Sequence, residues 1–168
     1  RCCPLPPAFG RSARSSYMRL HEHVQGQPHS LSKAVKLTQA RRAAAPKLSR
    51  RIADHLKDLG FKRSKIEIDL MPFEFPAPQG AETVDFIFAP NPGEPSKPLR
   101  IIASSGEMAR VMLAVKSALA KQDAIPLLVF DEIDANVGGE IASAVGAKMS
   151  ELAKNHQVIS ITHLPQVA

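Results

Sequence analysis

The sequence predicts an α/β fold built on a parallel sheet, and three segments near its C-terminal end carry this prediction. Residues 127–130 (LLVF) and 158–161 (VISI) are short apolar runs, and we expect each to be a strand buried on both faces of the sheet. The intervening residues 140–156 place apolar side chains at helical spacing, at Ile141, Val145, Met149 and Leu152. A strand, a helix and a second strand in this order predict a parallel crossover, with both strand ends on one edge of the sheet.

Polar side chains follow both predicted strands. Asp131 and Glu132 end the first, and Thr162 and His163 end the second. Ligands of open α/β sheets bind beyond the carboxyl ends of the strands. In a nucleoside-triphosphate site, Asp131 can hold Mg²⁺ and Glu132 can orient or deprotonate the attacking water. His163 would face both acids and would contact the γ-phosphate or that water. The alternatives are a solvated turn at the two acids and a structural, hydrogen-bonded histidine.

A third element, a helix within residues 103–122, follows a turn of small residues. Ser104 and Ser105 precede Glu107 in the manner of a capped helix start. One face of this helix is apolar and carries Val111, Met112, Val115, Ala118 and Leu119. The free N–H groups and the helix dipole at Ser104–Glu107 favour a phosphate, although an ordinary capped helix remains the alternative.

Four motifs in this order, SSGEMAR, LLVFDEID, ANVGGE and ITHLPQVA, resemble the C-terminal part of the ATPase head of the RecN family, bacterial DNA-repair proteins of the SMC and ABC ATPase superfamily. The resemblance covers residues 31–168. It implies the C-terminal half of an ABC-type P-loop NTPase head, with a small β-rich segment and the stub of a coiled coil. It also implies a role for each motif residue. Asp131 would bind Mg²⁺, and Glu132 and the switch histidine His163 would take part in catalysis. ATP contacts would come from Asp134 of the D-loop and from the signature residues, which are Ser104, Ser105, Gly106 and Glu107.

The phosphate-binding loop of such a head is missing from the sequence. No G-x-x-x-x-G-K-[ST] motif is present, so the backbone cradle and lysine that hold the β- and γ-phosphates are absent. We therefore expect a fragment that is inactive alone and that needs the N-terminal half of the head as a partner. The resemblance also implies self-association through ATP-bridged heads.

Two positions depart from the family pattern. Ser105 stands where the signature has a glycine, and a left-handed backbone there would cost a non-glycine residue about 1 kcal/mol. Pro46 lies inside a predicted helix, where an interior proline costs about 3 kcal/mol. We expect a shifted signature loop and a kink or break of the helix near residues 42–46.

The charge of the chain is unevenly spread. The net charge is +6, and the positive excess lies within the first 60 residues. There, lysines and arginines surround an apolar stripe that suits a coiled-coil seam ending at Gly60; the stripe is Leu48, Ile52, Leu56 and Leu59, and the cations are Lys33, Lys36, Arg41, Arg42, Lys47, Arg50, Arg51 and Lys57. This surface predicts nonspecific attraction to the DNA phosphate backbone, with a solvated helix face as the alternative.

The remaining sequence defines the expected organisation. Residues 1–30 are predicted to be a disordered or unrelated tail, residues 31–60 the end of a coiled-coil arm, and residues 61–168 the C-terminal half of the ATPase head. Cys2 and Cys3 of the tail support neither a disulfide framework nor a zinc site. No apolar run is long enough to span a bilayer, which predicts a cytoplasmic location, and the resemblance implies association with the bacterial nucleoid.

The predicted function is that of a RecN-like ATPase head fragment in DNA double-strand-break repair and recombination, using ATP and Mg²⁺. Two alternatives stay open. One is another ABC ATPase, such as an SMC-like head or a transporter subunit. The other is a non-enzymatic fragment that serves only as a dimerisation and DNA-binding surface.

Overall fold

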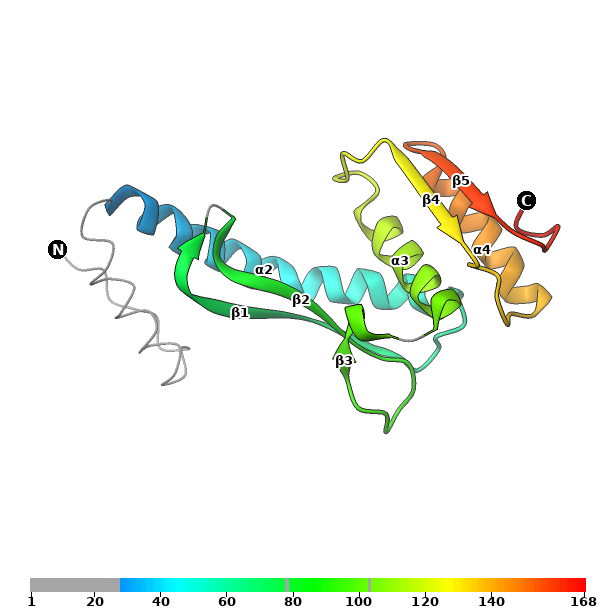
Figure 1. Cartoon of the computed structure of the whole chain (residues 1–168), viewed down its shortest axis with the longest axis horizontal. Coiled ribbons are helices and arrows are strands. Elements are labelled where there is room, and N and C mark those ends of the chain that lie inside the picture. Colours follow the sequence, from blue (N-terminus) through cyan, green and yellow to red (C-terminus); the bar gives the residue numbers. More distant parts are fainter. Residues whose placement is uncertain (1–27, 78, 103) are drawn as a thin grey trace. The chain divides into compact units, whose positions relative to one another are not determined.

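The computed structural model describes residues 28–77, 79–102 and 104–168. They divide into two compact units: the first comprises the residues up to Ala45 together with Asp69–Asp85, and the second comprises Pro46–Ile68 and Phe86–Ala168. Figure 1 shows the elements along the chain; in order they are α2 (Pro28–Asp58), β1 (Lys65–Ala77), β2 (Gly80–Ala89), β3 (Lys97–Pro98), the 3₁₀ turn η1 (Leu99–Ile101), α3 (Ser105–Leu119), β4 (Leu127–Asp131), α4 (Gly139–Leu152) and β5 (Gln157–Ile161). The predicted tail, including Cys2 and Cys3, lies outside the described residues apart from its last three positions, which begin α2.

Helix α2 runs through Pro46 without a break. Of the kink or break expected near residues 42–46, the break is therefore wrong, because the helix continues through the exposed Pro46, which removes one backbone N–H from it. The helix ends at Asp58, and Gly60, where the stripe was predicted to end, follows with a φ of +95° in the left-handed region. The Phe61 amide reaches back to the Leu56 carbonyl at 3.0 Å, which closes the helix with a Schellman-type cap.

The first unit is held together by a buried carboxylate. Arg41 of α2 places Nη1 3.1 Å from Oε2 of Glu82 in β2, and its Nη2 donates to the carbonyl of Gln79 at 2.7 Å. Glu82 is buried, so this ion pair and the bond to the turn fix the strand connection against the helix. Gly80 of that connection has a φ of +127° and lies so close to the Arg41 guanidinium that an added Cβ would collide with it.

The second unit contains the predicted strand, helix and strand. β4 and β5 pair in parallel, with Leu127 opposite Gln157 and Asp131 opposite Ile161. α4 connects the two strands, which confirms the parallel crossover and places both strand ends on one edge (Figure 1). In the same unit, β3 pairs antiparallel with the end of β2 and extends the sheet that β1 and β2 form.

The parallel sheet is buried on one face only, which corrects the expectation of burial on both faces. Leu128 and Phe130 of β4 point into the core. The alternate side chains are exposed, with 60% of Val129 and 60% of Ile161 accessible, and Leu127 and Ile159 belong to the same exposed set. The reason is that α3 and α4 supply core contacts to one face, while no described residues of the second unit bury the other.

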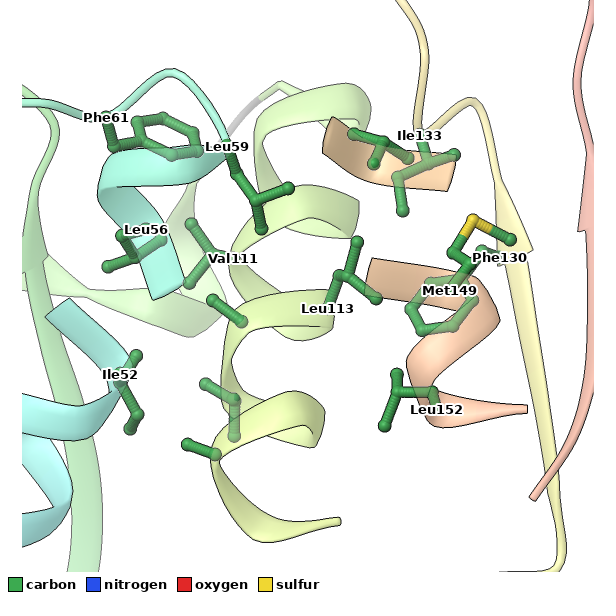
Figure 2. Close-up of a cluster of buried hydrophobic side chains, with 14 of the residues drawn as sticks. Ile52, Leu56, Leu59, Phe61, Val111, Leu113, Phe130, Ile133, Met149 and Leu152 are labelled. Carbon is green, nitrogen blue, oxygen red and sulfur yellow. The ribbon is translucent and has the colours of Figure 1, made fainter. Parts of the chain in front are cut away.

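The core of the second unit lies between α3, α4 and the end of α2. Figure 2 shows Leu56 and Leu59 of α2 beside Val111 of α3, and Leu113 of α3 beside Met149 of α4. The predicted stripe therefore packs into this core: Ile52, Leu56 and Leu59 are almost fully buried there rather than forming a seam with another long helix. Each such side chain contributes about 1.5–3 kcal/mol on burial, so the last turns of α2 form part of the unit's core.

Candidate functional site

The candidate site lies at the carboxyl edge of the parallel sheet. The register that pairs Asp131 with Ile161 makes Glu132 and Thr162 the next residues along the two strands, so the predicted acids and the predicted histidine follow the same edge. Asp131 and Glu132 are both exposed. Glu132 has a φ of 55°, in the left-handed region that non-glycine residues rarely adopt, so the chain turns sharply directly after β4.

The start of α3 is capped as the sequence predicted. Ser104 is the N-cap, and its hydroxyl oxygen accepts a bond from the Glu107 amide at 3.4 Å. Ser105 is the first residue of the helix, and among the described non-glycine residues only Glu132 and Asn136 have a positive φ. The left-handed strain considered for Ser105 is therefore absent.

Two further contacts fix the start of α3 to the loop that follows β4. The Ser105 hydroxyl donates a hydrogen bond to the Glu132 carboxylate. Gly106 is buried, and a Cβ built on it would lie 2.9 Å from Cβ of Ala135 and 3.1 Å from the Glu132 carbonyl oxygen. A side chain at Gly106 would push the helix away from the loop, so the glycine permits the close approach.

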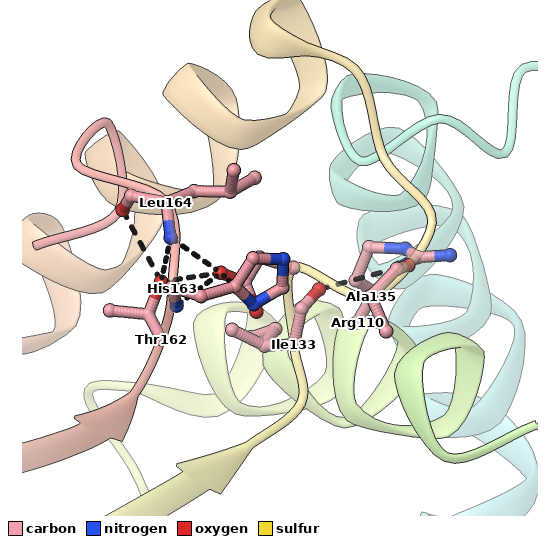
Figure 3. A network of polar contacts seen from close by, with 7 residues as sticks. Arg110, Ile133, Ala135, Thr162, His163 and Leu164 are labelled. Carbon is pink, nitrogen blue, oxygen red and sulfur yellow. Dashed lines mark hydrogen bonds and ion pairs between the residues drawn. The ribbon is translucent and has the colours of Figure 1, made fainter.

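Asp134 is the buried carboxylate of the site. Its Oδ2 accepts bonds from the amides of His163 and Leu164, each at 3.1 Å, and from the Thr162 hydroxyl. Figure 3 shows these donors converging from the segment after β5. Burial raises the pKa of Asp134, but the hydrogen bonds from Thr162, His163 and Leu164 outweigh it and hold the pKa below its usual value. Asp134 therefore secures the backbone of His163 and Leu164.

His163 lies at the predicted edge, with most of its side chain exposed. Its Nδ1 is 3.4 Å from Oδ2 of Asp134, so the carboxylate that it contacts belongs to Asp134. The side chain is 73% exposed and remains accessible to a ligand at the edge of the sheet.

Arg110 of α3 is a residue of this site that the sequence pattern did not reveal. Its Nη1 donates to the carbonyls of Ile133 and Ala135, at 3.3 and 3.1 Å (Figure 3). The Arg110 guanidinium also lies 5.6 Å from the ring centre of Phe61. Burial lowers the pKa of Arg110 more than the nearby Glu107 raises it. The available signal was the spacing, since Arg110 comes four positions before Ala114 and thus lies on the same buried face of α3.

The basic residues of α2 fall into two groups. Arg41 bonds the Glu82 carboxylate and the Gln79 carbonyl, so its side chain has a structural role in the first unit. In the second unit Lys47, Arg50 and Arg51 are exposed. In the part of the chain that the structure describes, no helix is long and apolar enough to cross a membrane, and no three histidine, cysteine or acidic side chains gather as metal ligands.

Similar sequences occur in bacterial repair proteins. The chain is 41% identical over 182 residues to the DNA repair protein RecN of Xylella fastidiosa, and this match covers the whole chain and 33% of the relative. The RecN proteins of Streptomyces coelicolor and Bacillus subtilis are 38% and 36% identical over 79% and 80% of the chain. The chain thus spans about a third of the length of the first of these relatives and about a quarter of the others. No family model matches the sequence.

Similar structures are heads of SMC proteins. An Smc head domain with a coiled coil and joint, from Pyrococcus yayanosii, superposes with a TM-score of 0.58 at 20% identity, covering 93% of this chain and 28% of that one. An Smc head with an extended coiled coil, from Pyrococcus furiosus, gives a TM-score of 0.56 at 20% identity over 93% of this chain and 35% of that one. These similarities show that this chain has the fold of a part of an SMC-type head with its coiled coil.

Proposed function

Because this chain belongs to the RecN family of SMC-like DNA-repair proteins, we propose that it forms one half of an ATP-hydrolysing head that acts in double-strand-break repair and recombination. The observation that carries the proposal is the edge of the parallel sheet. There, Asp131, Glu132 and the segment with His163 follow two paired strands, and the start of α3 contacts the same loop. Three elements distant in sequence thus bring the acids, the histidine and a helix start together.

The proposed roles follow from the chemistry of each group. Glu132 is the base that orients or deprotonates the attacking water, because it is an exposed carboxylate next to the strand end. His163 provides a polar contact to the γ-phosphate or that water from an exposed ring. The start of α3, from Ser104 to Glu107, contributes phosphate contacts through the helix dipole and through amides other than that of Glu107, which bonds the Ser104 hydroxyl. Asp134 acts from within the fold, by holding the His163 backbone and interacting with its ring.

The donor set also fits Mg²⁺ bound together with a nucleotide. Mg²⁺ prefers one or two carboxylates completed by phosphate oxygens and water, so a cage of protein ligands is not needed. Asp131 offers one exposed carboxylate directly at the strand end. When bound there, the ion would supply charge neutralisation for the transferred phosphoryl group.

The proposal requires a second half of the head, and the exposed face of the sheet supports it. Parallel sheets in α/β proteins are normally covered on both faces, since their strands are apolar throughout. In the second unit the face formed by Leu127, Val129, Ile159 and Ile161 is left exposed. We assign the half that carries the phosphate-binding loop to this face, and we expect the chain alone to be inactive because the loop is missing from its sequence.

Two partners complete the proposal. Heads that share ATP would associate with each other, with the α3 start of one head on the nucleotide of the other. DNA would be bound through its phosphate backbone by exposed cations of α2, among them Lys47, Arg50 and Arg51. No base readout is proposed, because the arm offers cations without interleaved aromatic residues.

The test uses the complete RecN of Xylella fastidiosa in which the matching third is replaced by this chain. The chimera should hydrolyse ATP. Glu132→Gln should retain ATP binding while lowering kcat by about 10²–10⁴-fold, the usual range for an acid–base group. Asp131→Ala should weaken binding of Mg-ATP.

Glu151→Gln is the matched control, since Glu151 is an exposed acid of α4 and lies away from the sheet edge. Its turnover should equal that of the unmodified chimera. A chimera without ATPase activity, or a Glu132→Gln variant with near-normal turnover, would refute the proposal.

A further inference from the structure

Lys148 of α4 reaches the end of α2 through two polar contacts within the second unit. Its Nζ lies 2.9 Å from Nδ1 of His55 and 3.0 Å from Oδ2 of Asp58. The Lys148 side chain is only 17% exposed, so its ammonium group is largely removed from water and depends on these two partners. None of the three residues belongs to the edge of the parallel sheet, so the contacts are separate from the candidate ATPase site.

The contact with Lys148 determines the protonation state of the His55 ring. An ammonium group has three N–H donors and no acceptor, so Nδ1 of His55 must accept the hydrogen bond. A ring nitrogen accepts only when it carries no proton, so the ring is neutral and its proton is on Nε2. A second proton, on Nδ1, would remove the acceptor and place two cations 2.9 Å apart. The contact therefore exists in one protonation state of His55 only.

The surroundings of His55 favour the neutral ring. The charged groups near it are Lys148 and Glu151 on α4, and Arg51, Asp54 and Asp58 on α2. Burial lowers the pKa of His55, and Lys148 lowers it further, while Glu151 and Asp58 act in the opposite direction and compensate only in part. The folded chain thus keeps His55 neutral at a pH where a histidine in the unfolded chain already takes up its second proton.

We infer that His55 and Lys148 form an acid-sensitive junction between the end of α2 and α4, which is closed while the His55 ring is neutral and opens when the ring takes a second proton. A groove of about 600 Å³ is lined in part by Lys148 and offers the released ammonium group a path into water. Ile52, Leu56 and Leu59 keep the same turns of α2 in the core, so opening loosens the polar side of this helix contact without detaching α2.

Nuclear magnetic resonance of the histidine rings tests the junction in the 168-residue chain, with the His55 signal identified by its absence from His55→Gln. In the unmodified chain the His55 ring should titrate with a pKa below its usual value of 6.5 and should carry no proton on Nδ1 at neutral pH. Lys148→Met removes the donor and its charge while keeping most of the side-chain volume, so it should raise the pKa of His55. Lys154→Met, the same change at an exposed lysine after α4, should leave that pKa in place.

Urea denaturation measures the effect of the junction on stability. Because the unfolded chain binds the proton more readily, the stabilisation is present above pH 6.5 and is lost as the pH falls through the lower, folded pKa of His55. His55→Gln keeps an acceptor for Lys148 at every pH, since its amide oxygen does not titrate in this range. Between about pH 7.5 and about pH 5, the folding equilibrium constant of the unmodified chain should fall about fivefold more than that of His55→Gln, the equivalent of one hydrogen bond of about 1 kcal/mol.

Three results would overturn the inference. They are a His55 ring that titrates at or above 6.5 in the unmodified chain, a pKa of His55 that Lys148→Met leaves unchanged, and equal acid-dependent losses of stability in His55→Gln and the unmodified chain. The first of these needs no substitution, so the test does not depend on a variant that folds. ATP hydrolysis is not among the measurements, so the inference and the proposed function can fail independently.

Discussion

Asp134 holds His163 at two points: its Oδ2 lies 3.1 Å from the backbone nitrogen of His163 and 3.4 Å from Nδ1 of the ring. The two residues are 29 positions apart and belong to the segments that follow β4 and β5. A single buried carboxylate thereby connects the two strand ends that carry the proposed ATPase chemistry.

The ionised form of Asp134 should stabilise the fold. Because hydrogen bonds hold its folded pKa below the usual value of 3.8, the unfolded chain binds the proton more readily than the folded chain. The resulting stabilisation is present above that value and is lost as the pH falls through the lower, folded pKa. Chemical denaturation from about pH 6 to about pH 3 should therefore show a falling free energy of unfolding, and Asp134→Asn should reduce this pH dependence.

Glu140→Gln is the comparison for that titration, since Glu140 is an exposed acid in the first turn of α4. It should leave the acid-dependent loss of stability in place. An Asp134→Asn variant with the same pH dependence as the unmodified chain would show that other carboxylates dominate the acid transition.

Arg110→Met should destabilise the second unit by about 1–3 kcal/mol, because it leaves the carbonyls of Ile133 and Ala135 without their guanidinium donor while keeping most of the side-chain volume. Equilibrium denaturation in urea measures the change. Lys121→Met, at an exposed position after α3, should stay within about 0.5 kcal/mol of the unmodified chain. Equal stabilities of the two variants would mean that the loop does not depend on Arg110.

Gly146→Ala should destabilise the chain although alanine favours helices by about 1 kcal/mol. The added Cβ would lie 2.5 Å from the Gln166 carbonyl oxygen, which is part of the backbone and has little freedom to move aside. Gly139→Ala is the matched change at the start of the same helix, where a Cβ meets no atom within 4 Å. A higher melting temperature for Gly146→Ala than for Gly139→Ala would show that the C-terminal segment does not pack against α4 as described.

The DNA proposal predicts a salt-dependent contribution from α2. Replacing Lys47, Arg50 and Arg51 with Gln should weaken binding to all duplex sequences alike and make the dependence of affinity on salt shallower, by about 0.9 in slope for each DNA phosphate that these cations no longer neutralise. Fluorescence anisotropy over a salt series measures both quantities. The control carries the same charge change at exposed lysines off this helix, Lys62, Lys121 and Lys154. Identical salt slopes for the two triple variants would show that the α2 cations lie on an ordinary solvated helix face and do not contact DNA phosphates.

Local pattern was sufficient to predict the elements that carry the site. Apolar runs and helical spacing predicted β4, α4 and β5, and the parallel direction of β4 and β5 follows from their order in the chain. The cap by Ser104 was predictable for the same reason, because donor and acceptor lie within one helical turn. Pro46 shows the limit of such local rules: its propensity favours a break, yet α2 continues through it.

The contacts that could assign roles within the site were decided by tertiary packing. Ser105 meets Glu132, Arg110 reaches the loop carbonyls and Asp134 gathers the segment after β5, and each of these pairs lies more than twenty positions apart in sequence. The sequence also did not determine on which faces β4 and β5 are buried, since an apolar strand has the same pattern whether one or both faces of its sheet are covered. Sequence alone specifies which side chains stand at the ends of the strands, because that depends on chain order and periodicity. Which of them touch depends on how closely α3 approaches the loop after β4, and that distance is decided by the packing of Gly106 against Ala135.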